Sequence, residues 1–497
     1  MLVKLASINH PYKNYNKYKR RTFMSASREH FSSRIGFILA AAGSAVGIGN
    51  LVGFPVNAAK NGGGAFLLMY ALFVFLICLP VMIAEMAVGR KTAKEPVGAY
   101  KELSQKSRLW GAAGLLGVLT PFMIAVFYMV ITVWIFGYIV LTLSGNLDYL
   151  ASSGGFGEFI NSPYLFLAMG VVAAIINFIL VAGVKDGIEK AAKILMPTLF
   201  VMLIIMVIFV LTLDNAMAGV TFFLIPDISK ITPSVVNGAL SQAFFSLSLG
   251  MGILITYGSY INNKTNIPNS AKLVALTDTG VAFIAGLMIL PAVFSFNPHI
   301  NPNELSDSSV SLIFTFLPKI FLALQTSIGY IGASAVAAFF FLLIFFAAIT
   351  SLVSILEVPV SYLVTEKQHS RKKALSILLM TAGVLTVFAT VSFGMITFFT
   401  EFTSYAGSTK SFFDVVYDVF YDTILPLNGF LLCVFVSYRW KKNNLSEHLS
   451  VGNDNYMGSW VEKYINFSLG TFIPAIVLII FINTVAQKFF AVSLFGF

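Results

Sequence analysis

The sequence predicts an all-α polytopic membrane protein, in which two inverted five-helix repeats are followed by one peripheral helix. The first observation is composition: 57% of the 497 residues are hydrophobic and 11% are charged, far more apolar than a soluble protein. The second is that windows of about 20 apolar residues define potential membrane spans along the whole chain. The third is that two spans, five apart in order, are interrupted by small and polar residues, which is typical of inverted repeats.

Eleven spans are predicted, centred near residues 47, 77, 128, 173, 202, 248, 284, 347, 382, 427 and 476. Spans 1–5 form the first predicted repeat, residues 34–214, and spans 6–10 form the second, residues 215–440. Residues 1–33 are expected to be a cytoplasmic tail, and residues 441–497 to hold a cytoplasmic loop and span 11.

The basic residues predict the orientation, because positively charged loops stay in the cytoplasm. Most Lys and Arg residues fall in the N-terminal tail and in the loops that join even-numbered to odd-numbered spans. The predicted outer segments hold only Lys60, Lys230, Lys319, Lys410 and Lys488. We therefore expect a multi-pass plasma membrane protein with its N-terminus in the cytoplasm and its C-terminus outside. The net charge of +10 then reflects topology and contact with anionic lipids of the bilayer, not nucleic-acid binding.

Span 1 contains the segment Gly43–Pro55, whose sequence is GSAVGIGNLVGFP. Glycines at membrane depth free backbone amides and carbonyls, which must be buried in protein or bound by a ligand. The alternative is a helix-packing face, since Gly43 and Gly47 stand in a Gly-x-x-x-Gly relation. Span 6 contains a second break, at Gln242–Gly252, whose sequence is QAFFSLSLGMG. Paired breaks favour a binding site for substrate and coupling ions between the repeats.

The two breaks offer mostly neutral oxygen atoms. Hydroxyls of Ser44, Ser246 and Ser248, the amide of Asn50 and unwound carbonyls suit a hard cation such as sodium. The N-terminal ends of half-helices suit a carboxylate, and their C-terminal ends suit an ammonium. A zwitterionic amino acid matches both.

Other polar residues inside spans are candidates for ion binding. Thr350 and Ser351 are adjacent in span 8; each hydroxyl either bonds back to its own helix or binds an ion. Asp278 in span 7 is functional by default, because burying an unpaired carboxylate costs several kcal/mol. Glu85 and Glu357 are either functional or structural, bonded to exposed helix ends.

Four segments resemble the neurotransmitter:sodium symporter family, and specifically its bacterial amino-acid branch, which includes the bacterial leucine transporter. These segments are 28–55, Asn61–Phe66, Gln242–Tyr260 and Ala347–Pro359, and the similarity extends over about residues 28–440. The resemblance implies the leucine-transporter fold, two sodium ions as coupling ions, no organic cofactor, and a small amino acid as substrate.

The resemblance also implies site residues. The first sodium site would use Ala45, Asn50, Ser246 and Asp278, together with the substrate carboxylate. The second would use Gly43, Val46, Ala347, Thr350 and Ser351. The substrate site would use Ser44, Ala45, Ile48, Gly49, Ile124, Tyr128, Phe245, Ser246, Ser248, Met251, Ser351 and Ile355. In that set Tyr128 and amides near Gly49 meet the carboxylate, and Ile48, Ile124, Phe245, Met251 and Ile355 form an apolar wall.

Chloride-dependent relatives hold the anion near positions matching Tyr70, Gln242 and Ser246. Here Asp278 is expected to supply a fixed negative charge, so that chloride is not required. Arg28, Tyr260 and Glu366 are the implied cytoplasmic gate residues.

The chain departs from the family at both gates. At the extracellular gate, this chain has Gly53 where the family usually has Arg, and Tyr417, next to Asp418, where the family has the Asp partner of that Arg. At the cytoplasmic gate, it has Phe31 in place of the usual Trp and Thr365 in place of the usual Asp.

These observations favour a sodium-coupled symporter for hydrophobic or aromatic amino acids, working by alternating access as a monomer or weak homodimer. The alternative on the same fold is a carrier of an osmolyte or biogenic amine, for which the family typically supplies an Asp at the position of Ser44. An enzyme would need clustered catalytic or metal-binding side chains, and no such spacing is visible in the sequence. A channel would need repeated polar rings along a pore.

Overall fold

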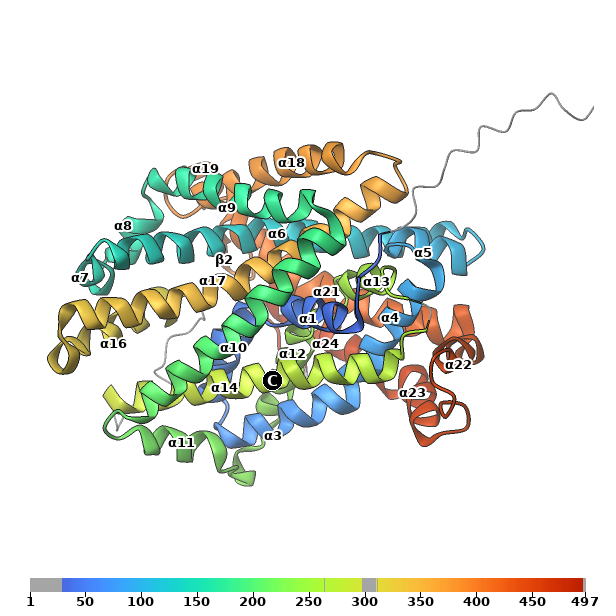
Figure 1. The fold of residues 1–497 in the computed structure, drawn as a ribbon, viewed down its shortest axis with the longest axis horizontal. Helices are drawn as coiled ribbons and strands as arrows, with labels where there is room; N and C mark the ends of the chain where they lie inside the picture. The colour runs from blue at the N-terminus through green and yellow to red at the C-terminus, as the bar shows by residue number, and fades with distance from the viewer. Residues whose placement is uncertain (1–28, 263, 297–309, 311, 495–497) are drawn as a thin grey trace, which may run out of the picture.

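The computed structural model describes residues 29–262, 264–296, 310 and 312–494. Its first half contains spans 1–5 (Figure 1). Span 1 is α1 (Arg34–Ala45), η1 (Gly49–Gly53) and α2 (Phe54–Lys60); span 2 is α3 (Gly64–Phe73), η2 (Val74–Cys78) and α4 (Leu79–Thr92). Spans 3, 4 and 5 are α6 (Arg108–Leu143), α9 (Tyr164–Val181), and η3 (Val184–Glu189) with α10 (Lys190–Leu211). Short helices α5 (Pro96–Leu103), α7 (Leu147–Ala151) and α8 (Gly155–Ile160) connect them.

The second half begins with α11 (Ala216–Leu224) and η4 (Ile228–Lys230). Span 6 is α12 (Pro233–Ser246) and α13 (Ile253–Gly258), and span 7 is α14 (Ile267–Phe296). After η6 (Leu312–Phe316) and α16 (Leu317–Ala323), spans 8 and 9 are α17 (Gln325–Thr365) and α18 (Arg371–Val391).

The last spans follow α19 (Thr397–Thr400) and the antiparallel hairpin of β1 (Thr403–Tyr405) and β2 (Ser408–Lys410), in which Ser404 pairs with Thr409. Span 10 is α20 (Phe412–Val416), η7 (Tyr417–Ile424), α21 (Leu425–Val434), η8 (Phe435–Lys441) and α22 (Lys442–Ser450). Span 11 is α23 (Trp460–Gly470) and α24 (Phe472–Phe490).

Nine of the eleven predicted centres fall in a helix, and the other two, near residues 47 and 248, fall in the non-helical breaks of spans 1 and 6. Among the described residues, nine helices are long and apolar enough to cross a membrane alone. A tenth span is a pair, α1 with η1–α2, bent by 55° at its break. The predicted span near residue 248 consists of a 14-residue and a 6-residue helix, each too short to cross alone.

The halves of the bundle exchange packing partners. Helix α1 of span 1 packs against α14 of span 7, while α12 and α13 of span 6 pack against α3 and α4 of span 2. In the same way α10 of span 5 packs against α17 of span 8, and η7 and α21 of span 10 pack against α6 of span 3. Two related five-span units that face each other produce this reciprocal pattern. Helix α24 packs along α21 at the edge of the bundle.

The break in span 6 depends on glycine. Ser248, Gly250 and Gly252 all have positive φ, at 53°, 76° and 67°. A Cβ on Gly250 would lie 2.5 Å from the Leu425 carbonyl oxygen, so no other residue fits without a shift. The freed backbone is satisfied by two buried side chains: Glu85 accepts from the Gly250 amide at 2.8 Å, and Asn428 donates to the Gly250 carbonyl at 3.0 Å. Glu85 therefore holds an open helix segment, one of its two predicted roles.

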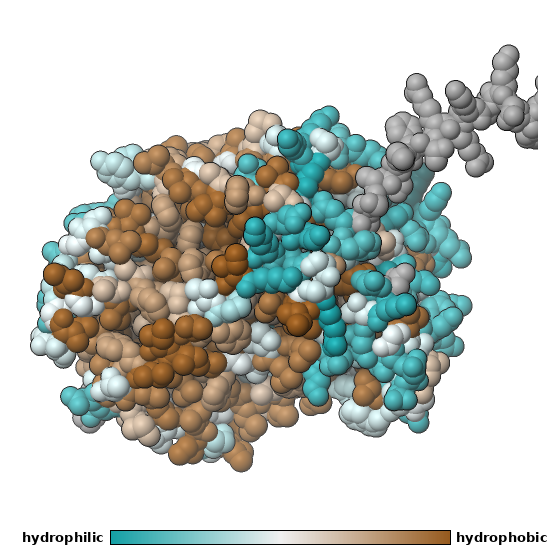
Figure 2. Space-filling view, in the orientation of Figure 1, coloured by the Kyte–Doolittle hydropathy of each residue, from teal (hydrophilic) through white to brown (hydrophobic). Residues whose placement is uncertain are grey.

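The outer surface agrees with a membrane setting. Figure 2 shows a broad hydrophobic surface over most of one face and hydrophilic residues gathered at one end. Large apolar side chains such as Phe178 (77% exposed) and Ile331 (85% exposed) lie on this outer surface. Exposing such apolar side chains to water is unfavourable, whereas contact with the apolar lipid tails of a membrane is not.

Candidate functional site

A small cavity lies where the two breaks meet α6 and α17. It is lined by Ser44, Ala45, Gly47, Gly49, Asn50, Ile124, Tyr128, Gln242, Phe245, Ser246, Ser248, Met251, Ser351, Ile355 and Tyr421. The break in each half of the chain therefore contributes to one shared site.

Eleven of the twelve residues predicted for the substrate site line this cavity, and Ile48 does not. The Ile48 side chain is buried, and the residue instead reaches the site through its backbone, because its N–H donates to the Tyr128 hydroxyl at 3.2 Å. The apolar-wall role of Ile48 remains a prediction, since its side chain is buried but is not among the residues that line this cavity. Tyr421 lines the cavity and was not predicted.

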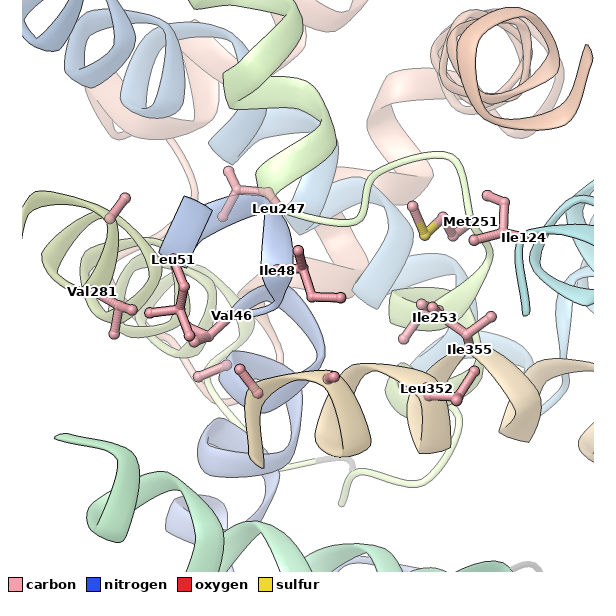
Figure 3. Close-up of a cluster of buried hydrophobic side chains, with 14 of the residues drawn as sticks. Val46, Ile48, Leu51, Ile124, Leu247, Met251, Ile253, Val281, Leu352 and Ile355 are labelled. Atoms are coloured by element: carbon pink, nitrogen blue, oxygen red, sulfur yellow. The ribbon is translucent and has the colours of Figure 1, made fainter. Parts of the chain in front are cut away.

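The cavity has an apolar side. Ile124, Met251 and Ile355 come from α6, the unwound part of span 6, and α17, and Figure 3 shows their side chains close together. Phe245 extends this side, and its ring stacks on Tyr421 with centroids 4.8 Å apart and planes at 25°. A wall of this kind favours an apolar group and rejects a charge.

On the opposite side lies a buried polar cluster. The Asn50 amide donates to Asp278 Oδ1 at 2.7 Å and to Ser246 Oγ at 2.9 Å. Ser246 Oγ donates to Asp278 Oδ2 at 2.8 Å, and the Tyr70 hydroxyl donates to the same oxygen at 3.2 Å. Asn50, Asp278 and Tyr70 are each 0% exposed. The predicted trio from spans 1, 6 and 7 is thus in direct contact, and Tyr70 of span 2 joins it.

A second group of oxygen atoms surrounds Ser351. Its hydroxyl lies 3.3 Å from the Gly43 carbonyl, 3.1 Å from that of Ser44 and 3.3 Å from that of Val46. The Thr350 hydroxyl instead donates within its own helix, to the carbonyls of Phe346 and Ala347 at 3.0 Å. The two hydroxyls therefore differ: Ser351 joins spans 1 and 8, and Thr350 shows the helix-internal bond that was one of its two predicted states.

Ser44 and Gly47 at the break in span 1, and Ser248 at the break in span 6, also line the cavity. Ser248 Oγ donates to the Ser44 carbonyl at 3.2 Å, which links the two breaks directly. The Ser44 hydroxyl is buried and has no hydrogen-bond partner among the described residues. Gly47 leaves room for the neighbouring hydroxyls, since a Cβ there would lie 2.7 Å from the Tyr128 oxygen and 2.8 Å from Ser351 Oγ.

The cytoplasmic gate residues are placed in different groups. Arg28 lies outside the described residues. Tyr260 donates to Glu357 at 2.8 Å, and Arg371 forms bonds of 3.1 and 2.6 Å to the two Glu357 oxygens. Glu366 is not part of this group, because it pairs with Lys101 at 3.3 Å.

Phe31 closes the same region with its ring. It packs edge-on against Tyr257 at 5.5 Å and against Tyr260 at 6.2 Å, and its N–H donates to the Tyr260 carbonyl. Glu357, buried and paired with Arg371, has the structural role that was one of its two predicted roles.

Comparison with known proteins agrees with this fold. The family described as "Sodium:neurotransmitter symporter family" matches residues 28–156 and 158–493. An uncharacterized sodium-dependent transporter, YhdH of Bacillus subtilis, is 34% identical over 464 residues, covering 92% of this chain and 97% of the relative. A similarly described transporter of Haemophilus influenzae is 34% identical over 479 residues, covering 93% and 99%.

A solved structure is also similar. The crystal structure of MhsT in complex with L-phenylalanine matches with a TM-score of 0.79 and 38% sequence identity, covering 92% of this chain and 99% of that chain. The match confirms the leucine-transporter fold. The chain therefore belongs to the sodium:neurotransmitter symporter family, and it is a sodium-dependent, multi-pass membrane transporter.

Proposed function

We propose that this protein imports a hydrophobic or aromatic amino acid together with two sodium ions, by alternating access. The observation that carries the proposal is the division of the cavity into an apolar side and a side of unwound backbone and buried hydroxyls. The phenylalanine complex of the similar MhsT structure supports the same substrate class.

The substrate amino and carboxyl groups would lie between the breaks. The Tyr128 hydroxyl and the amides near Gly49 would donate to the carboxylate, and unwound carbonyls near Ala45, Phe245 and Ser248 would accept from the ammonium. The side chain would point to Ile124, Met251 and Ile355. A substrate amine without a carboxylate would need a protein carboxylate near Ser44, and the Ser44 hydroxyl cannot replace it.

The first sodium ion would bind at Asn50, Ser246, Asp278 and the Ala45 carbonyl. Its support is the contact among the three side chains, at 2.7–2.9 Å, together with their burial. The Asp278 carboxylate also accepts from Tyr70 and Ser246, two of the positions near which chloride-dependent relatives hold their anion. A fixed carboxylate at this place would make chloride unnecessary.

The second sodium ion would bind at the carbonyls of Gly43, Val46 and Ala347 and the hydroxyls of Thr350 and Ser351. The convergence of the Gly43 and Val46 carbonyls on Ser351 supports this site. It lies between span 1, which we propose to move with spans 2, 6 and 7, and span 8 of the remaining scaffold. Two sodium ions crossing about 100 mV supply about 4.6 kcal/mol, enough for a gradient of roughly a thousandfold.

A binding screen of the twenty amino acids, taurine and a biogenic amine, with sodium or potassium, tests the proposal. We expect purified protein to bind phenylalanine, leucine or a similar amino acid only in sodium. Met251→Ala should weaken binding of the largest side chains more than of the smallest, whereas Met380→Ala, at a site 65% exposed, should not. Equal binding in potassium, or preference for the amine or taurine, would contradict the proposal.

A further inference from the structure

An ion cluster joins α24 of span 11 to η7 of span 10. Lys488 Nζ of α24 lies 2.9 Å from Asp418 Oδ1 and 2.6 Å from Asp422 Oδ2, both on η7 of span 10. Asp418 also accepts from the Tyr405 hydroxyl of β1 at 2.7 Å. The carboxylate side chains are only 6% and 14% exposed.

The two carboxylates depend on the lysine. Asp418 and Asp422 are one helical turn apart, a spacing at which like charges repel each other. A partly buried carboxylate without a partner is costly, and here one ammonium contacts both. Without Lys488 the two carboxylates lose their shared counter-charge, which should loosen the packing of η7 at this turn.

The same helical stretch carries aromatic residues of the cavity. Tyr421, next to Asp422 in sequence, lines the cavity and stacks on Phe245 at 4.8 Å. Tyr417, next to Asp418, packs against Tyr421 at 4.9 Å and against Phe127 at 5.1 Å. Lys488 also lies over the Tyr417 ring, 5.8 Å from its centroid. Ion pairs thus hold one face of η7. The neighbouring residues of the same stretch are Tyr421, which lines the substrate cavity, and Tyr417, which packs on Tyr421.

We propose that Lys488 is a positioning residue of the outer gate: through Asp418 and Asp422 it holds Tyr421 against Phe245. The part of the inference that concerns substrate retention rests on the proposed function, whereas the packing of Tyr421 on Phe245 limits access to the cavity with or without substrate. It gives span 11, expected from sequence to be peripheral, a part in substrate retention. The contacts of α24 with α21 and η7 provide the physical connection.

The test compares Lys488→Met, which keeps the length of the chain but removes the charge, with Lys488→Arg, which keeps the charge. In purified, sodium-loaded protein we expect Lys488→Met to release labelled phenylalanine at least tenfold faster, with little change in the association rate. Lys488→Arg should restore slow release. Lys319→Met removes an exposed lysine from α16 and is the matched control.

A second measurement needs no substrate. A cysteine at Ile124, with buried Cys78 and Cys433 replaced by serine, reports access to the cavity for a membrane-impermeant thiol reagent. Lys488→Met should speed its labelling, and Asp418→Asn with Asp422→Asn in the same protein should reverse the increase by removing the stranded charges. If wild-type protein binds no amino acid but labelling still changes, the proposed function fails and the gate inference stands. Unchanged release and unchanged labelling in folded Lys488→Met would overturn the inference.

Discussion

Asp278→Asn is the sharpest test of the polar cluster, because it removes a charge with almost no change in shape. Asp278 accepts hydrogen bonds from Asn50, Ser246 and Tyr70 through both of its oxygens. An asparagine keeps only one acceptor oxygen, so at least one charge-assisted bond is lost, and each is worth about 1.5–3 kcal/mol. Those bonds hold the carboxylate in place. In the proposed site the carboxylate also contacts the ion, and losing about 2 kcal/mol of that contact corresponds to roughly thirtyfold weaker sodium binding.

The assay is a sodium titration of phenylalanine binding, run in chloride and again in gluconate. In gluconate the half-saturating sodium concentration of Asp278→Asn should rise roughly thirtyfold, or phenylalanine binding should disappear. In chloride an anion near Tyr70 and Ser246 should recover part of the loss. Asp214→Asn, at an exposed position, controls for the general effect of removing a carboxylate. Identical titrations of wild type and Asp278→Asn in both anions would refute the role of Asp278 as the fixed counter-charge.

Two further substitutions separate groups that look alike in the sequence. Ser351→Ala removes the hydroxyl near three span-1 carbonyls and should raise the half-saturating sodium concentration about tenfold, or about 1.4 kcal/mol. Thr350→Val should have the smaller effect, because the Thr350 hydroxyl also bonds its own helix, and unchanged sodium titrations of both variants would contradict the second sodium site. Phe245→Ala removes the ring that stacks on Tyr421 and should weaken phenylalanine binding at least tenfold, because a large apolar contact is lost. Phe178→Ala on the lipid-facing surface is its control, and equal affinities of the two variants would show that Phe245 does not cover the substrate.

The fold could be predicted because its main features are local in the sequence. Breaks in membrane spans need glycine and small polar residues, so Gly43–Gly53 and Ser246–Gly252 are visible without any structure. The positive φ angles of Gly250 and Gly252 confirm that this composition reflects unwound backbone. The family resemblance then placed Asn50, Ser246 and Asp278 together, although 228 positions separate the first from the last.

The missed residues depend on packing between spans that no local pattern reveals. Tyr421 reaches the cavity only because η7 presents it there, and the bond from the Ile48 N–H to the Tyr128 hydroxyl is likewise a contact between distant spans. One signal was present but unused: Asp418 and Asp422 are two carboxylates inside a predicted span, and such residues are expected to have a partner. The partner, Lys488, lies 70 residues from Asp418 in sequence, on the span that was predicted to be peripheral.

The two proposed gates share one physical arrangement in place of the ion pairs that the family resemblance implies. On the side proposed to be outer, Gly53 and Tyr417 stand at the positions of the charged pair; the rings of Phe245 and Tyr421 line the cavity, Tyr417 packs on Tyr421, and Lys488 pairs with Asp422 on the same helical stretch. On the cytoplasmic side, the Phe31 ring packs on Tyr257 and Tyr260, and the charges lie behind them at Glu357 and Arg371. Closure by apolar contact with partly buried ion pairs is less sensitive to screening than closure by exposed pairs, because salt weakens exposed pairs far more than buried ones; Asp418 and Asp422 are 6% and 14% exposed, although Lys488 is 39% exposed. Added salt should therefore speed substrate release from the wild-type protein less than it would speed release through a gate built on a fully exposed ion pair.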